Sequence, residues 1–119
     1  IIEPCGFHLS DKRFKRVVMD YMDWDKINIY QSSDKFFEAK KSQRIVLMTT
    51  KASVSYTEFK FEKNDTILFG RESAGVPESV HQLINDRLKI PMCEDTRSLN
   101  IASSVAIILA ESLRQTKLI

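Results

Sequence analysis

Short apolar runs alternate with helix-like segments along this chain. Residues 44–50, around the run Ile-Val-Leu-Met, and residues 66–69 carry consecutive apolar side chains, as strands buried on both faces do. A further short strand is expected at 88–92, where a proline ends it. Residues 27–30 alternate apolar and polar positions, as a short strand does.

Helical segments separate these strands. A first helix is expected over residues 11–22, with Ser10 as its N-cap. Ser33 is expected to cap a short second helix, and Pro77 to occupy the first turn of a third. The apolar residues that indicate these helices are Phe14, Val17, Val18 and Tyr21 in the first, Phe36 and Phe37 in the second, and Val80, Leu83 and Ile84 in the third.

The last helix, expected over about residues 100–115, has apolar residues around most of its circumference. They are Ile101, Ala102, Val105, Ala106, Ile107, Ile108, Leu109 and Leu113. A helix this apolar is buried on more than one side. In a small chain, the second buried side indicates a subunit interface, with Ile108 and Leu109 or their neighbours against another subunit.

Strands and helices therefore follow one another along the chain. This order is typical of an α/β fold with a mostly parallel sheet covered by helices on both faces. Residues 52–63 are polar and mixed, with alternation only at 58–61. A chain of 119 residues without a repeat or a low-complexity stretch is expected to form one domain.

Composition excludes several classes of protein. With 43% hydrophobic and 29% charged residues, the chain is an ordinary globular protein, and its apolar runs are too short to cross a membrane. Cys5 and Cys93 lie far apart and are expected to be small apolar side chains in a reducing cytosol. His8 and His81 are isolated, so no metal site is expected.

The net charge of +2 does not by itself indicate a partner, but the basic residues are clustered. The clusters are Lys12, Arg13, Lys15 and Arg16, and then Lys40, Lys41 and Arg44. Clustered cations favour contact with phosphates through counterion release. A solvated helix face is the other interpretation of the same pattern.

The segment TILFGRESAGVP, residues 66–77, carries the strongest candidate site. A buried strand ends at Gly70, a carboxylate follows at Glu72, and Gly75 and Pro77 lead into a helix. Ligands in open α/β folds bind just outside the carboxyl ends of the strands, and glycine lets backbone approach a ligand closely. The loop is therefore a candidate cofactor site, although two glycines also suit a tight strand-to-helix turn.

Three motifs in order make a more specific signal. FGRESAGVP at 69–77, KIPM at 89–92 and RSLNIASSVAI at 97–107 resemble the knotted (SPOUT) RNA ribose methyltransferases of the SpoU class. Within that class, the chain is most similar to the small tRNA (cytidine/uridine-2′-O)-methyltransferases that modify the wobble nucleotide. The opening IIEPCGF, the segment at 11–24 and Thr-Thr-Lys at 49–51 match as well, so the resemblance covers nearly the whole chain.

This resemblance implies an enzyme that transfers a methyl group from S-adenosylmethionine to a ribose 2′-hydroxyl of tRNA in the cytoplasm. It implies a C-terminal trefoil knot and a homodimer formed through the C-terminal helix. Family members begin with one more strand and helix, which carry an arginine-containing motif. Since Ile1–Ile2 is typical of the tail of a buried strand, we expect residues 1–119 to form a single methyltransferase domain without that first strand and helix.

The resemblance also assigns roles to residues. Those that would hold the cofactor are Met48, Thr49, Gly70, Ile90, Ser98 and Leu99. Glu72 and Asn100 are the candidates for a catalytic role, Asn100 either facing the ribose or fixing the loops. Arg71, Arg87 and Arg97 match no arginine motif of the family and receive no role.

Each residue also has a purely structural interpretation. Met48 and Ile90 could be core residues, Ser98 and Asn100 helix caps, and Glu72 a solvated loop acid. Two other functions compete with the first: methylation of a base or of ribosomal RNA on the same fold, and non-catalytic RNA binding. A phosphate-binding NTPase fits poorly, because the chain has no GxxxxGK[ST] motif. A dinucleotide-binding enzyme also fits poorly, because no GxGxxG motif follows a strand.

Overall fold

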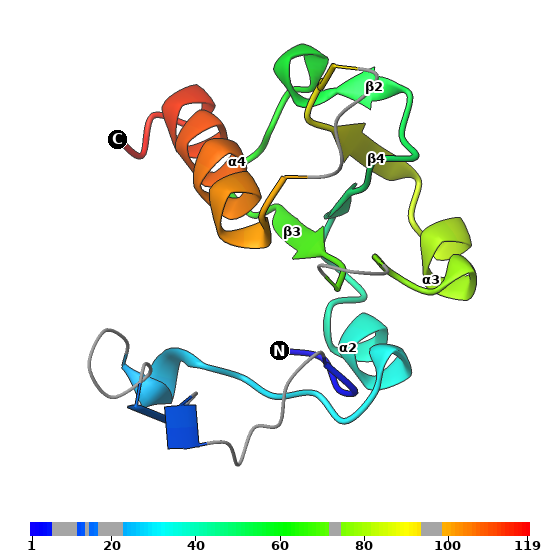
Figure 1. The fold of residues 1–119 in the computed structure, drawn as a ribbon, viewed down its shortest axis with the longest axis vertical. Helices are drawn as coiled ribbons and strands as arrows, with labels where there is room; N and C mark the ends of the chain where they lie inside the picture. Colours follow the sequence, from blue (N-terminus) through cyan, green and yellow to red (C-terminus); the bar gives the residue numbers. More distant parts are fainter. Residues whose placement is uncertain (6–11, 14, 17–22, 72–74, 94–98) are drawn as a thin grey trace. The chain divides into compact units, whose positions relative to one another are not determined.

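A computed structural model describes residues 1–5, 12–13, 15–16, 23–71, 75–93 and 99–119 (Figure 1). The chain divides into two compact units, Ile1–Lys41 and Ser42–Ile119. Most of the helix predicted at 11–22, with its Ser10 cap, lies outside the described residues. Its four basic residues, Lys12, Arg13, Lys15 and Arg16, are described and are helical and exposed.

The first unit contains a short parallel pairing in place of the strand predicted at 27–30. Ile2 forms a parallel bridge with Tyr30, and the Tyr30 N–H donates to the Ile1 carbonyl at 2.8 Å. The Glu3 N–H in turn donates to the Tyr30 carbonyl at 2.8 Å. Ile2 is therefore paired as the end of a strand would be. The pairing involves Tyr30 alone and not the whole segment 27–30 that the alternation of apolar and polar residues predicted.

Two further helices of this unit are η1, Trp24–Lys26, and α2, Ser33–Ala39. The cap of α2 is Ser32 and not Ser33, which corrects the prediction by one residue. The Ser32 hydroxyl accepts the Lys35 N–H at 3.2 Å, satisfying one of the N–H groups that a helix start leaves without a partner. Phe36 of α2 is buried and meets Tyr30 edge to face.

Among the described residues, four parallel strands form the sheet of the second unit, in the order β2-β4-β1-β3. They are β1 at Ile45–Met48, β2 at Val54–Ser55, β3 at Thr66–Phe69 and β4 at Asp86–Lys89. The helices are η2 at Tyr56–Glu58, α3 at Glu78–Leu83 and α4 at Ile101–Gln115. The predicted α/β class with a mostly parallel sheet is confirmed.

Two strands differ from the prediction. The strand predicted at 88–92 is β4, which begins at Asp86 and ends at Lys89, so that Ile90 lies just beyond it. Only Leu88 of this strand is buried. Because its neighbours Arg87 and Lys89 are charged, the strand does not form an apolar run in the sequence. The segment 52–63 contains β2, an edge strand of only two residues, and natural sheets often have very short edge strands.

Helices cover both faces of the sheet (Figure 1). Val46 and Leu88 form a buried cluster with Phe61 and with Ile108 of α4. Thr49 and Arg87 occupy the alternate positions of their strands, on the opposite face, and both hydrogen-bond with α3. β1 and β4 therefore direct Val46 and Leu88 toward α4, while Thr49, just after β1, and Arg87 of β4 contact α3.

The burial of α4 corrects one expectation about the subunit interface. Ile108 is fully buried within its own chain, in the cluster on the sheet, so it is not available to a second subunit. Leu109 and Val105 of the same helix are 49% and 37% exposed. The apolar circumference seen in the sequence is thus divided between an intramolecular face and an exposed face.

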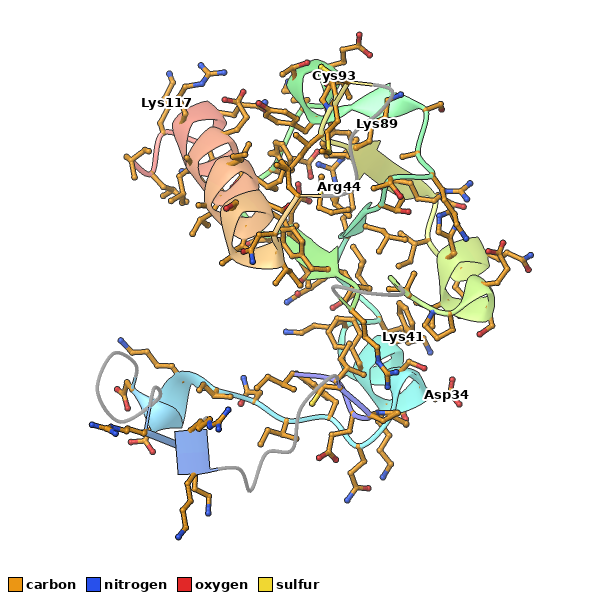
Figure 2. All side chains as sticks on the ribbon, in the orientation of Figure 1. Asp34, Lys41, Arg44, Lys89, Cys93 and Lys117 are labelled. Atoms are coloured by element: carbon orange, nitrogen blue, oxygen red, sulfur yellow. The ribbon has the colours of Figure 1, made fainter. Side chains whose placement is uncertain are left out.

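An arginine holds together the amino ends of β1 and β3. Arg44, labelled in Figure 2, donates to both carboxylate oxygens of Asp65 at 2.7 Å and to the Lys60 carbonyl at 2.9 Å. Its guanidinium also lies 4.7 Å from the ring centre of Phe59. Burial would raise the pKa of Asp65, but hydrogen bonds from Arg44 and the Glu62 N–H lower it below its usual value.

The far end of α4 is tied to the same region through Gln115. Its amide oxygen accepts the Phe61 N–H at 2.8 Å, and its amide nitrogen donates to the Phe59 carbonyl at 3.0 Å. Both backbone groups are thereby satisfied by one side chain. Since Phe61 belongs to the buried cluster, Gln115 anchors α4 beside the core.

Glu111 gives α4 a contact that depends on pH. Arg114 donates to its carboxylate at 2.9 and 2.6 Å, and Gln115 donates at 3.0 Å. These hydrogen bonds lower the pKa of Glu111 from 4.5 to about 2. Because the pKa falls on folding, the ionised carboxylate stabilises the fold above pH 4.5, and this contribution is lost as the pH falls through about 2.

We therefore expect Glu111→Gln to lower the melting temperature at neutral pH, and the difference from the parent to shrink toward about pH 2. Thermal melts followed by circular dichroism across this range measure the difference. Arg114→Gln should reproduce the effect, because it removes the main cause of the shift. A difference that stays constant with pH would contradict this assignment.

None of the helices in the described part of the chain combines the length and apolar character needed to span a bilayer.

Candidate functional site

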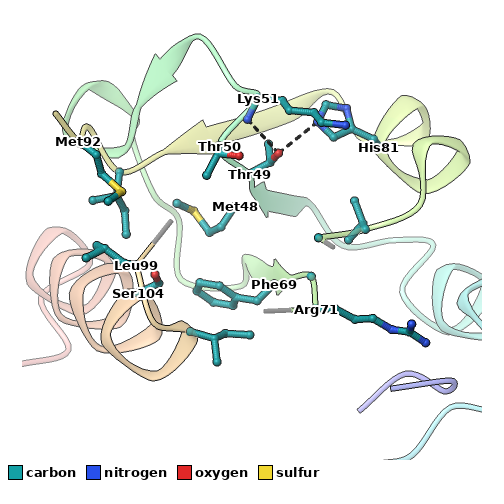
Figure 3. Close-up of a pocket in the computed structure, with 15 residues that line it drawn as sticks. Met48, Thr49, Thr50, Lys51, Phe69, Arg71, His81, Met92, Leu99 and Ser104 are labelled. Atoms are coloured by element: carbon teal, nitrogen blue, oxygen red, sulfur yellow. Dashed lines mark hydrogen bonds between the residues drawn. The ribbon is translucent and has the colours of Figure 1, made fainter. Parts of the chain in front are cut away.

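A cavity of about 290 Å³ lies at the carboxyl ends of the strands (Figure 3). We call it the strand-end cavity. The described residues that line it are Met48, Thr49, Thr50, Lys51, Phe69, Gly70, Arg71, Gly75, Val76, His81, Ile90, Met92, Leu99, Ile101 and Ser104. They come from the carboxyl ends of β1, β3 and β4, from the loop before α3, from α3 itself and from the start of α4. Open α/β sheets bind ligands at the carboxyl ends of their strands. Its volume is near the lower end of the range of about 300–1,000 Å³ for small-molecule sites.

The cavity brings together residues that are far apart in the sequence. The predicted cofactor residues on its wall are Met48, Thr49, Gly70, Ile90 and Leu99. Ser98 and Glu72 lie outside the described residues. Asn100 is not among the lining residues and instead precedes α4 beside the cavity. Location thus agrees with the cofactor prediction for five residues, while the role of each stays a prediction.

Gly70 is required by the loop itself. A Cβ at this position would lie 2.6 Å from the Gly75 Cα and from the Val76 nitrogen, and would also contact the Gly75 carbonyl carbon. These atoms are backbone and cannot move aside as a flexible side chain could. Arg71 and Gly75 are paired by reciprocal N–H···O bonds of 3.2 and 2.8 Å, which hold the two ends of the loop together.

This packing changes the interpretation of the glycine. The sequence predicted that Gly70 leaves room for a ligand, whereas the nearest atoms within this structure are those of its own loop. Gly75 has open space around it but a positive φ of 66°, which glycine adopts without strain. The two glycines therefore serve the loop in different ways.

Asn100 is the N-cap of α4, as its structural interpretation predicted. Its side-chain oxygen accepts the Ala102 N–H at 2.9 Å and the Ser103 N–H at 3.4 Å. Its carbonyl accepts both the N–H and the hydroxyl of Ser104, a cavity-lining residue. Asn100 thereby fixes the start of α4 at the edge of the cavity.

The wall of the cavity has two chemical sides. Met48, Phe69, Ile90, Met92, Leu99 and Ile101 form an apolar group. Thr49, Thr50, Lys51 and His81 form a polar group around the end of β1, and Figure 3 shows them together. Lys51 makes a loose ion pair with Glu78 at 3.8 Å, and both side chains are well exposed. Such a cavity suits a ligand that has a flat apolar part and a polar, anionic part.

Sequence reasoning missed His81, which it described as isolated. His81 is 6% exposed, and its Nδ1 lies 2.9 Å from Arg87 Nη1. Its Nε2 lies 3.4 Å from the Thr49 hydroxyl. The available signal was its place between Val80 and Ile84, which are buried on the same helical segment.

The sequence was then compared with protein families. The sequence model of the SpoU rRNA Methylase family matches residues 1–110. The chain belongs to the SpoU rRNA Methylase family. This confirms the resemblance inferred from the motifs at 69–77, 89–92 and 97–107.

Individual relatives of this SpoU family chain are similar over almost its whole length. A tRNA (cytidine(34)-2'-O)-methyltransferase of Beijerinckia indica subsp. indica is 46% identical over 97% of this chain and 73% of its own. A solved structure described as giving structural insights into the 2-OH methylation of C/U34 on tRNA is 37% identical, with a TM-score of 0.83. The match covers 96% of this chain and 75% of that one.

A more distant structure is an AdoMet-bound rRNA methyltransferase from Sinorhizobium meliloti. It is 25% identical, with a TM-score of 0.65, over 75% of this chain and 36% of the other. The same fold thus occurs in proteins named for tRNA and for rRNA.

Proposed function

We propose that this protein is a tRNA ribose methyltransferase that uses S-adenosylmethionine to methylate the 2′-hydroxyl of nucleotide 34, a cytidine or uridine. The observation that carries the proposal is the 46% identity to a tRNA (cytidine(34)-2'-O)-methyltransferase over 97% of the chain. The strand-end cavity supports it, since five of the residues expected to hold the cofactor line this cavity.

The strand-end cavity fits this cofactor chemically. S-adenosylmethionine, when bound, supplies a methyl group on a sulfonium, which is already an excellent leaving group. The chain must therefore bind and orient its reactants and exclude water. The apolar side of the cavity, with Met48, Ile90 and Leu99, would hold the adenine. Thr49 and Gly70 line the remaining wall, and Ser98 belongs to the same predicted set.

The 2′-hydroxyl must lose a proton during transfer, and this step needs a positioned acceptor. Glu72 is the carboxylate that the sequence offers for it, and Asn100 is the second candidate. Because the Asn100 side-chain oxygen caps α4, its hydrogen bonds favour fixing the loops over taking part in proton transfer. We therefore propose Glu72 as the acceptor and Asn100 as a residue that positions the cavity wall.

The test of the function is methyl incorporation. Purified protein with labelled S-adenosylmethionine is incubated with total tRNA and, separately, with ribosomal RNA, and the nucleosides are identified by mass spectrometry. We expect 2′-O-methylated cytidine or uridine from tRNA and no product from ribosomal RNA. Incorporation into ribosomal RNA alone would favour methylation of ribosomal RNA, which the family's name and the Sinorhizobium meliloti structure support.

We also propose a homodimer formed through the exposed face of α4. Leu109 and Val105 provide apolar surface on this helix, and Leu118 and Ile119 follow it. Exposed apolar side chains that gather on one element mark interaction surfaces. Leu109→Glu is expected to convert a dimer into a folded monomer, as measured by sedimentation velocity at micromolar concentration. A parent protein that sediments as a monomer would contradict the dimer.

Three further features belong to this proposal. The family resemblance supports a trefoil knot in the C-terminal segment, which a crystal structure of the protein would test. The family match over residues 1–110 supports a single methyltransferase domain across residues 1–119. Because tRNA is its proposed substrate, the enzyme is proposed to act in the cytoplasm.

A further inference from the structure

His81 joins a chain of three side chains that runs from the sheet surface to the strand-end cavity. His81 is a polar residue that is only 6% exposed. Burying an imidazole is costly unless its nitrogens have hydrogen-bond partners. Here Nδ1 meets Arg87 of β4 and Nε2 meets Thr49 at the end of β1.

Arg87 determines which ring nitrogen of His81 carries the proton. A guanidinium has donors and no acceptor, so in the 2.9 Å contact between Nη1 and Nδ1 the arginine must donate. Nδ1 is then an acceptor without a proton, and the proton of the neutral ring lies on Nε2. The Nε2–H therefore donates to the Thr49 hydroxyl oxygen across a long separation of 3.4 Å.

The hydroxyl oxygen of Thr49 thus accepts two hydrogen bonds. One comes from His81, and the other comes from the Lys51 backbone N–H at 3.2 Å (Figure 3). With both acceptor positions occupied, the hydroxyl can act only as a donor toward a further group. No acceptor for it lies among the described residues, and Thr49 lines the strand-end cavity.

We propose that the Thr49 hydroxyl donates a hydrogen bond to the carboxylate of the cofactor's methionine part, and that His81 and Arg87 are positioning residues that orient this hydroxyl. The proposal rests on the proposed function. The apolar side of the cavity suits adenine, which leaves the side with Thr49, Thr50 and Lys51 for the anionic end of the ligand. A hydroxyl turned outward as a donor, beside a lysine, is the chemistry that recognises a carboxylate.

Two ligands separate this contact from any other. S-adenosylhomocysteine carries the amino-acid part, and 5′-methylthioadenosine has the same adenosine and sulfur without it. Calorimetry should show that Thr49→Val lowers the affinity for S-adenosylhomocysteine at least about tenfold, as expected for a lost hydrogen bond to a charged group. Binding of 5′-methylthioadenosine should not change, and Thr49→Ser, which keeps the hydroxyl, should restore the affinity for S-adenosylhomocysteine.

Two substitutions of His81 test the positioning roles. Glutamine places an amide N–H near the site of Nε2 and can donate to Thr49, whereas asparagine can accept from Arg87 but is too short to reach Thr49. We expect His81→Gln to bind S-adenosylhomocysteine nearly as the parent does, and His81→Asn to lose affinity as Thr49→Val does. Gln82→Ala, on the exposed side of α3, is the control and should bind as the parent does.

The outcomes separate this inference from the proposed function. If the parent binds neither ligand, the proposed function fails and the inference with it. If the parent binds both and Thr49→Val weakens both equally, Thr49 serves the adenosine or the fold, and the inference is wrong. It is also wrong if Thr49→Val binds S-adenosylhomocysteine as the parent does, or if His81→Gln and His81→Asn lose affinity alike. Thermal melts of each variant show that it is folded.

Discussion

Replacing Gly70 by alanine is expected to abolish binding of S-adenosylhomocysteine. The new Cβ would lie 2.6 Å from the Gly75 Cα and the Val76 nitrogen, well inside contact distance, so the backbone of the loop must shift. That shift separates the paired Arg71 and Gly75 and moves one wall of the strand-end cavity. Calorimetry measures the loss of binding, and circular dichroism shows whether the sheet is retained.

Gly75→Ala is the matched control within the same loop. A Cβ at Gly75 would meet no atom within 4 Å, but the residue has a positive φ of 66°. Alanine there costs about 1–2 kcal/mol in backbone strain without a clash. We expect weaker binding that is still measurable, together with a lower melting temperature. If Gly70→Ala binds as tightly as the parent, the loop does not form the cofactor site.

Ile108→Ala is expected to destabilise the protein by about 2–5 kcal/mol, the usual cost of truncating a fully buried isoleucine. Ile108 is fully buried against Val46, Phe61 and Leu88, so its truncation leaves a cavity between α4 and the sheet. The start of the same helix carries Ile101 and Ser104 on the cavity wall. Because α4 would pack less tightly on the sheet, the affinity for S-adenosylhomocysteine should fall as well. Chemical denaturation and calorimetry measure the two effects.

The neighbouring Leu109 provides the contrast. Its side chain is 49% exposed, so Leu109→Ala should leave the free energy of unfolding of the single chain nearly unchanged. Its effect should fall on the assembly of two subunits. Equal destabilisation by Ile108→Ala and Leu109→Ala would mean that the division of α4 into a core face and an exposed face is wrong.

The sequence predicted most of what depends on local pattern. Runs of consecutive apolar residues predicted β1 and β3, and the glycine at the end of β3 predicted the loop that lines the cavity. The apolar run at β1 reflects burial in the middle of the sheet, whereas β3 is an edge strand of the described sheet whose residues are only partly buried, so the expected burial on both faces was wrong for β3. Residues far apart were grouped into one site through the family resemblance of three motifs, and parallel strands that end at the same edge of the sheet explain why such motifs meet.

What the sequence missed depends on contacts between distant elements. β4 was placed too late because Arg87 and Lys89 flank its only buried residue, and Arg87 is accommodated through His81 of α3. The hydrogen-bond partners of His81 could not be predicted, because Thr49 follows β1 and Arg87 belongs to β4. α4 likewise has one face buried on the sheet and one face exposed. Its apolar residues surround most of the helix, so the sequence could not show which face is buried.

We propose that this chain methylates a ribose hydroxyl at nucleotide 34 of tRNA. The most direct measurement is methyl transfer to two tRNAs that differ at that nucleotide alone, one with the natural ribose and one with 2′-deoxyribose. The account predicts transfer to the first, mapped to nucleotide 34 by mass spectrometry, and none to the second. Equal transfer to both would show that the methyl group goes to a base or to another nucleotide, and would contradict the account.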